Sequence, residues 1–107
     1  MADVTKQTER DALIAAAKTA FSTGFDGALS IAPDGMKPFL VDGMGETCRI
    51  VDEAPDNAQA DGVWRSTPQT LLEVFSRKRA LESSYLSGRL QIGGDMSIMA
   101  RLVLKAT

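Results

Sequence analysis

The side chains that most often carry catalysis are scarce in this sequence. Cys48 is the only cysteine, and there is no histidine. Histidine is the usual general base near neutral pH, and zinc sites and activated nucleophiles are built mainly from histidine and cysteine. We therefore expect no enzyme activity, no catalytic residue and no cofactor. Cys48 falls on the apolar face of a predicted strand, so we interpret it as a small buried hydrophobe.

Carboxylates are the remaining groups that could hold a metal ion. Asp26, Asp34, Asp42 and Glu46 lie near the ends of predicted strands, where they could gather. Each is also next to a glycine, and short acidic side chains favour turns because they bond to the neighbouring backbone. We prefer turn formation over a metal site and predict no metal ligands.

Positive charge is dense only at Arg77-Lys78-Arg79. Such a run could contact anionic lipid head groups during a transient visit to a membrane surface. The alternative, a solvated connection between two helices, is favoured by the acidic balance of the chain, whose net charge is -2. The same balance argues against nucleic acid as a partner, because phosphate binding needs a basic surface.

The length of 107 residues corresponds to one domain, and we predict a single domain over 1–107. Residues 1–6 lack the apolar run of a signal peptide, and no apolar stretch is long enough to span a bilayer. One cysteine cannot form an internal disulfide, which suits a reducing compartment. We expect a cytoplasmic protein.

The helices and strands that position the cysteine, the carboxylates and the basic run are predicted from hydrophobic periodicity and turn residues. Thr8 with Asp11 resembles a capping box, and Gly24 is a stop signal for the first helix. Turns at 33–35 and 42–45 separate the first strands, and the second turn favours a hairpin. The predicted order is a helix at 9–22, then strands at 25–31, 38–41, 47–51 and 62–65, with a polar loop at 53–59.

The pattern changes to helical spacing after Arg65. Ser66 or Thr67 caps a helix that has Pro68 in its first turn. A second short helix is predicted at 80–87, ended by Gly88, and a strand at 90–92. Gly93-Gly94 then turns the chain, and Asp95 caps a last helix. The predicted order is helix, four strands, two helices, strand, helix. Because most of the strands and helices fall in separate groups along the chain, this order indicates the α+β class.

The most specific stretch is residues 88–96, with the sequence GRLQIGGDM. It resembles the sterol carrier protein family, in particular the sterol carrier protein two type of lipid-binding domain. The similarity runs without gaps from Asp61 to Met96, and Tyr85-Leu86 stands where the family has paired aromatics. Alone, the stretch would favour a simple strand–turn–helix corner. Together with the upstream match and the order of elements, it favours the family.

Two residues depart from the family pattern. Arg77 stands where members often have a glycine between the two middle helices, so we expect that break to be shaped differently. Trp64 stands at a strand position usually held by a smaller apolar residue, and it could fill pocket volume or face solvent.

The resemblance implies a five-stranded, mostly antiparallel sheet covered on one side by helices, with an apolar cavity between them. It implies non-catalytic binding, and transfer, of a hydrophobic ligand such as a fatty acid, acyl-CoA, phospholipid, sterol or isoprenoid. One alternative is an accessory scaffold with a filled core and a protein partner in lipid or quinone metabolism. Another is a detached domain of an enzyme.

The expected pocket wall consists of apolar residues from the helices and the sheet. For each of them, an ordinary core position is the alternative. The methionines favour the pocket because thioethers adapt to irregular ligands. The predicted ligand-binding residues are Phe21, Leu29, Ile31, Ile50, Leu71, Phe75, Tyr85, Leu86, Leu90, Met96, Met99 and Leu102.

Overall fold

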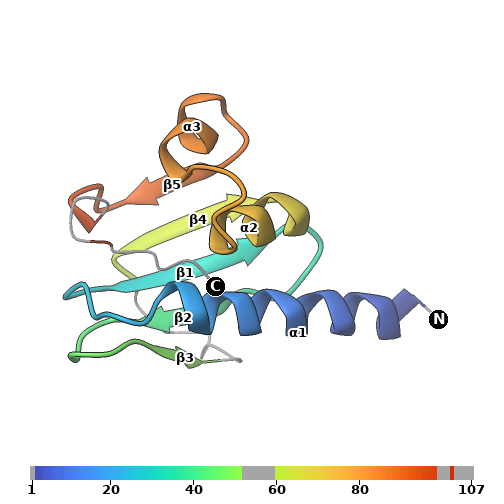
Figure 1. Cartoon of the computed structure of the whole chain (residues 1–107), viewed down its shortest axis with the longest axis horizontal. Helices are drawn as coiled ribbons and strands as arrows, with labels where there is room; N and C mark the ends of the chain where they lie inside the picture. Colours follow the sequence, from blue (N-terminus) through green and yellow to red (C-terminus); the bar gives the residue numbers. More distant parts are fainter. Residues whose placement is uncertain (1, 52–59, 99–101, 103–107) are drawn as a thin grey trace.

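The computed structural model of the protein describes residues 2–51, 60–98 and 102. Its helices and strands alternate as helix, four strands, two helices, strand (Figure 1). The elements are α1 (Ala2–Ala20), β1 (Ala28–Pro33), β2 (Phe39–Asp42), β3 (Arg49–Val51), β4 (Gly62–Ser66), α2 (Pro68–Phe75), α3 (Leu81–Leu86) and β5 (Gln91–Gly94). The α+β class predicted from the sequence is confirmed.

The strands form one sheet in the order β3-β2-β1-β4-β5. Neighbours run antiparallel except at the centre, where β1 and β4 are parallel and Ile31 lies opposite Trp64. The hairpin predicted around residues 42–45 is the antiparallel pair of β2 and β3. The sheet is therefore mostly antiparallel, as expected.

Alternation along the strands gives the sheet one buried face. Leu29 and Ile31 of β1 and Trp64 of β4 point to this face and are almost fully buried. Their neighbours Ser30 and Val63 point the other way and are only partly buried. Both α1 and α2 cover the buried face, whereas α3 lies at the β5 edge (Figure 1).

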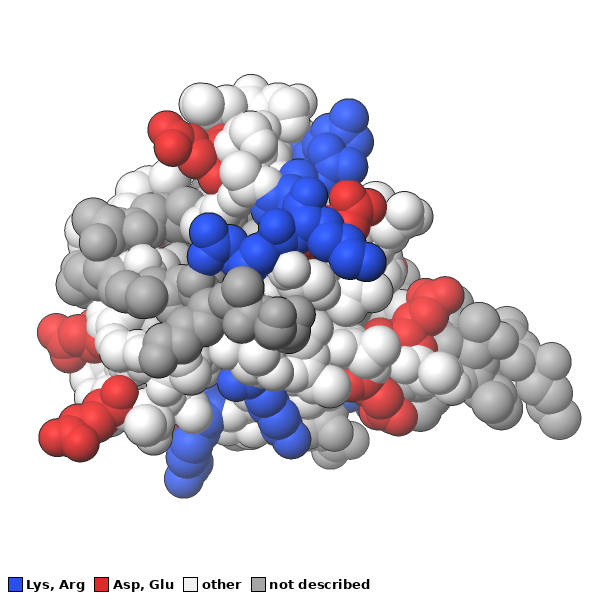
Figure 2. Space-filling model, in the orientation of Figure 1, with Lys and Arg blue, Asp and Glu red and all other residues white. Residues whose placement is uncertain are grey.

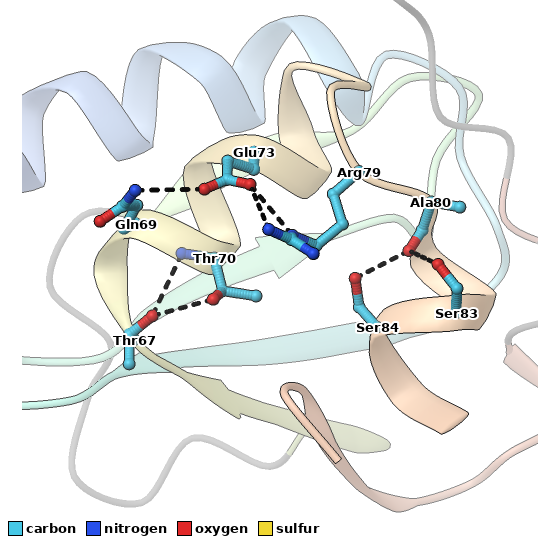
Figure 3. A network of polar contacts seen from close by, with 8 residues as sticks. All are labelled: Thr67, Gln69, Thr70, Glu73, Arg79, Ala80, Ser83 and Ser84. Carbon is cyan, nitrogen blue, oxygen red and sulfur yellow. Dashed lines mark hydrogen bonds and ion pairs between the residues drawn. The ribbon is translucent and has the colours of Figure 1, made fainter. Parts of the chain in front are cut away.

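Helix α2 begins where the sequence predicts. The Thr67 hydroxyl oxygen accepts a hydrogen bond from the Thr70 backbone N–H, at 3.1 Å, and Pro68 occupies the first turn. This cap satisfies one of the free N–H groups at the helix start. Figure 3 shows the cap, together with the ion pair of Glu73 and Arg79 at the other end of α2.

Helix α1 differs from the predicted 9–22 because it begins at Ala2 and ends at Ala20. Thr8 and Asp11 therefore lie inside the helix and do not mark its start. The preceding residues contain neither glycine nor proline, so nothing in the sequence stops the helix there. On the buried side of α1, Arg10 donates to the Lys37 and Pro38 carbonyl oxygens, at 3.3 and 3.4 Å, which ties the helix to the chain entering β2.

Several strand boundaries also differ, and β3 begins at Arg49 where the sequence predicts a start at residue 47. Strand β1 begins at Ala28 because Asp26 has a positive φ of 57°, a left-handed conformation that interrupts an extended chain. Strand β5 continues through Gly93 and Gly94, which pair with Val63 and Gly62. The predicted turn at Gly93-Gly94 is therefore wrong by two residues, and the chain leaves the sheet after Gly94.

The corner after β5 matches the predicted role of Asp95. Its carboxylate oxygen Oδ1 accepts from the Ser97 backbone N–H at 2.9 Å and from the Ser97 hydroxyl at 2.6 Å. The last helix predicted from the sequence includes residues 99–101, which lie outside the described residues. The polar loop predicted at 53–59 also lies outside them. None of the helices in the described ranges is long and apolar enough to cross a membrane.

Candidate functional site

The apolar layer between the sheet and helices α1 and α2 contains half of the predicted pocket residues. They come from β1, from α2, from the residue after α1 and from the residue before β5, and they have almost no exposed surface. The residues brought together in this core are Phe21, Leu29, Ile31, Leu71, Phe75 and Leu90. Ile50 and Leu102 are partly buried and pack against the same core.

Three predicted pocket residues lie at the surface. Leu86 is 74% exposed, Met96 41% and Tyr85 40%. Helix α3 has only six residues and packs at the sheet edge, and its buried residue is Ser84. The Ser84 hydroxyl donates to the Ala80 carbonyl oxygen at 2.8 Å, so this small side chain needs no other partner (Figure 3). The helix consequently turns Tyr85 and Leu86 outward. Met99 lies outside the described residues.

Aromatic rings occupy the centre of the core. The ring centroids of Phe21 and Trp64 are 5.7 Å apart, and those of Phe21 and Phe75 are 5.5 Å apart with the rings nearly perpendicular. Trp64 and Phe75 stack with an interplanar angle of 23°. Phe25 joins the group through Phe21 at 6.3 Å. The large side chain of Trp64 therefore fills interior volume and does not face solvent.

The sequence leaves open whether Trp64 fills pocket volume or faces solvent, and Trp64 is not among the predicted pocket residues. Its position on β4 shares a face with Gly62 and Ser66, and alternation alone could have assigned it to the interior. Its indole nitrogen Nε1 is fully buried and has no hydrogen-bond partner among the described residues. Among the described core residues, Trp64 is the one that carries a buried side-chain hydrogen-bond donor without a partner.

A groove of about 510 Å³ opens between α1 and the start of α2. Its floor is Leu13, which is only 1% exposed and belongs to the same core as Trp64. Leu72 and Pro68 form one wall, and polar side chains stand at the rim. The full lining is Glu9, Ala12, Leu13, Thr67, Pro68, Gln69 and Leu72. A concave, mainly apolar surface of this size suits a small hydrophobic molecule.

Asp42, one of the carboxylates considered for metal binding, has a structural role. Asp42 accepts the Met44 backbone N–H at 3.1 Å, which is the turn chemistry expected from the sequence. Within residues 2–51 and 60–98, no three acidic, cysteine or histidine side chains gather in a way that could hold a metal ion.

Cys48 is partly buried, and its Sγ donates to the Thr23 carbonyl oxygen at 3.2 Å. Burial raises the pKa of the thiol, and the nearby charge of Asp42 raises it further. A thiol held in its neutral form is a poor nucleophile. The prediction that Cys48 is a buried residue within a strand is therefore wrong in two respects, since Cys48 precedes β3 (Arg49–Val51) and is only partly buried. It still packs against the core as a small side chain.

The basic run lies in the connection between α2 and α3. Arg79 forms an ion pair with Glu73 at 2.9 Å and is half-buried. Arg77 and Lys78 are exposed, and Arg77 has a positive φ of 61°. Lys and Arg side chains cluster in this region of the surface (Figure 2). An arginine thus adopts the left-handed conformation that glycine adopts most readily.

Comparison with known proteins identifies the fold. No protein-family model matches the sequence, and no curated protein matches it by sequence. The structure aligns with the sterol carrier protein domain 2 of Helicoverpa armigera at a TM-score of 0.59 and 11% identity, over 72% of this chain and 63% of that one. It aligns with the UbiJ-SCP2 ubiquinone synthesis protein at a TM-score of 0.58 and 18% identity, over 88% of this chain and 70% of that one. Other structures of sterol carrier protein 2 align as well, and the chain has this fold.

An enzyme also contains a similar unit. The chain aligns with the sec-alkylsulfatase Pisa1 from Pseudomonas sp. at a TM-score of 0.55 and 20% identity. The alignment covers 79% of this chain but only 14% of the enzyme. The same fold therefore occurs both as a separate domain and as a small part of a larger protein.

Proposed function

We propose that this chain binds a hydrophobic ligand reversibly and without chemical change, taking it through the groove between α1 and α2 into the apolar layer above the sheet. The observation that carries the proposal is the groove itself, set in a sterol-carrier-protein fold. Its floor residue Leu13 is shared with the core, so a chain inserted between Leu13 and Leu72 would meet apolar side chains throughout.

The energetics of burial favour a modest affinity. Each CH₂ group moved out of water contributes about 0.8 kcal/mol, so a long acyl or isoprenoid chain contributes on the order of 10 kcal/mol before costs. Loss of free motion on association costs roughly 4–15 kcal/mol. The balance corresponds to a dissociation constant in the micromolar range as an order of magnitude. An affinity of this size permits both uptake and release.

The test is a titration of the purified chain with a fluorescent long-chain fatty acid. We expect saturable binding by the wild-type chain. Leu72→Asn should weaken it, because Leu72 lines the groove and is 37% exposed. Leu86→Asn is the matched control, since Leu86 is an exposed helical leucine outside the groove. Equal weakening by both variants, or no saturable binding by the wild type, would refute the proposal.

The aromatic core supports a second candidate, an accessory scaffold that binds a protein partner. Phe21, Trp64 and Phe75 already fill the centre of the apolar layer. A folded chain that takes up no fatty acid in the titration would favour this function. The proposal that the chain is not an enzyme is tested separately, by the absence of turnover of acyl esters and alkyl sulfates.

Delivery of a lipid would also require contact with a membrane. We propose that the exposed cations Arg77 and Lys78 supply it by attraction to anionic head groups, at about 1 kcal/mol for each residue near the surface. Sedimentation with phosphatidylserine vesicles should exceed that with phosphatidylcholine vesicles and should fall in the double variant Arg77→Gln, Lys78→Gln. Equal sedimentation with both lipids would rule this contact out.

A further inference from the structure

An unpaired hydrogen-bond donor lies in the middle of the apolar core. Trp64 is 0% exposed, and its Nε1–H has no acceptor among the described residues. The large majority of buried side-chain polar atoms in folded proteins have a partner, so such a group calls for an explanation. The Ser22 hydroxyl is the other buried side-chain atom of this kind in the described ranges.

The indole ring of Trp64 lies in a cluster of three aromatic rings. It contacts Phe21, just past the end of α1, and Phe75, at the end of α2, and these two rings also contact each other. Ile31 and Ile92 lie opposite it on the neighbouring strands. Because the ring is fully buried among these neighbours, its N–H is not exposed to surface water.

A donor in such a place selects the chemistry of its acceptor. One indole N–H offers a single neutral hydrogen bond, which matches a ketone, ester, quinone or hydroxyl oxygen. A carboxylate or phosphate would have to give up its hydration in exchange for that one bond, and the cost of burying a charge is far greater. The site therefore favours a neutral oxygen carried within an otherwise apolar molecule.

We infer that the Trp64 Nε1–H is a recognition point for a neutral oxygen acceptor on the buried ligand, so that the chain prefers oxygen-bearing lipids to plain hydrocarbon chains. This inference rests on the proposed function, since it requires a ligand that enters the core. It adds a specificity-determining residue that the apolar lining by itself does not supply. The route would pass Leu13, the residue shared by the groove and the core.

The experiment compares two ligands of the same shape. One is a long-chain methyl ketone, and the other is the alkene in which a methylene group replaces the ketone oxygen. Binding is measured by the rise in melting temperature with ligand concentration, which applies to any ligand of the native state. Wild type should bind the ketone about tenfold more tightly, the worth of one hydrogen bond. Trp64→Phe keeps an aromatic ring but removes the N–H, so it should lose the preference for the ketone.

A second measurement does not depend on how the variant folds. Trp64 is the only tryptophan, so wild-type protein labelled with ¹⁵N gives a single indole N–H resonance. The ketone should move this resonance downfield, as hydrogen bonding does, whereas the alkene should leave its proton without an acceptor.

The possible results distinguish a failure of the inference about Trp64 from a failure of the proposed lipid binding. If both ligands bind equally and the ketone does not shift the indole resonance, the inference fails and the proposed function stands. The inference also fails if the ligand-free protein already shows a hydrogen-bonded indole that the ketone does not change, because water is then the partner. If neither ligand binds, the proposed function fails and the inference falls with it.

Discussion

The two adjacent glycines near the end of β5 should respond in opposite ways to the same substitution. Gly94 has a positive φ of 86°, and a Cβ built on it would overlap the Asp61 carbonyl oxygen and come within 2.9 Å of the Gly62 Cα. That oxygen also accepts the Asp95 backbone N–H at 2.7 Å. Gly93 has no atom within 4 Å of the position of its Cβ. Gly94→Ala and Gly93→Ala therefore form a matched pair.

The size of the difference follows from these contacts. An L-residue in the left-handed region costs about 1 kcal/mol or more, and disrupting the bond from Asp95 to Asp61 leaves a polar group unpaired at a cost of about 1–3 kcal/mol. For Gly94→Ala we expect a loss of about 3 kcal/mol, or roughly 10–20 °C in melting temperature for a domain of this size. Gly93→Ala should gain about 0.5–1 kcal/mol, because glycine is unfavourable within a strand.

Thermal unfolding followed by circular dichroism, with urea titration for the free energies, measures both variants. Equal melting temperatures for Gly94→Ala and Gly93→Ala would refute the reasoning, since only Gly94 has the positive φ and the backbone contact. If Gly93→Ala lowered the unfolding free energy as much as Gly94→Ala, the result would favour the turn at Gly93-Gly94 that the sequence predicts.

Three further outcomes follow from the structure. Arg77→Gly should stabilise the fold by about 0.5–1 kcal/mol by relieving its left-handed φ, whereas Lys78→Gly should destabilise it, and urea unfolding that ranks them the other way would contradict the conformation of Arg77. The pKa of Cys48 is raised, so its stabilising contribution is complete below the ordinary thiol value of 9.0 and is lost as the pH rises through the higher folded value. Above pH 9 the unfolding free energy of the wild type should therefore fall more steeply than that of Cys48→Ala, and parallel curves would argue against this. Thr67→Ala should cost about 1 kcal/mol through loss of the α2 cap, which a melting curve unchanged from the wild type would disprove.

Local signals in the sequence predict most of the fold because each has a short-range cause. The cap at Thr67, the left-handed exit at Gly88 and the bonds of Asp95 depend on a few neighbouring residues, and the structure contains all three. The start of α1 was missed because Thr8 and Asp11 suit a cap but no helix-breaking residue precedes them. A local motif cannot exclude a longer helix.

The candidate site was less predictable, since it depends on which elements meet in space. Helical spacing grouped Tyr85 and Leu86 with the core, yet the position of α3 at the sheet edge leaves both exposed. The sequence leaves two alternatives for Trp64, pocket or solvent, because its contact with Phe21 joins residues more than 40 positions apart. The groove between α1 and α2 is likewise a product of tertiary packing.

The central claim, that an apolar chain enters the core between α1 and α2, can be tested at Trp64 itself. Bromine quenches indole fluorescence only on close approach, and Trp64 is both the single tryptophan and fully buried. Titration with a long-chain fatty acid brominated near its methyl end should quench the fluorescence saturably, while the unbrominated acid should not. Fluorescence that stays unchanged at brominated-acid concentrations well above the micromolar range would contradict the account.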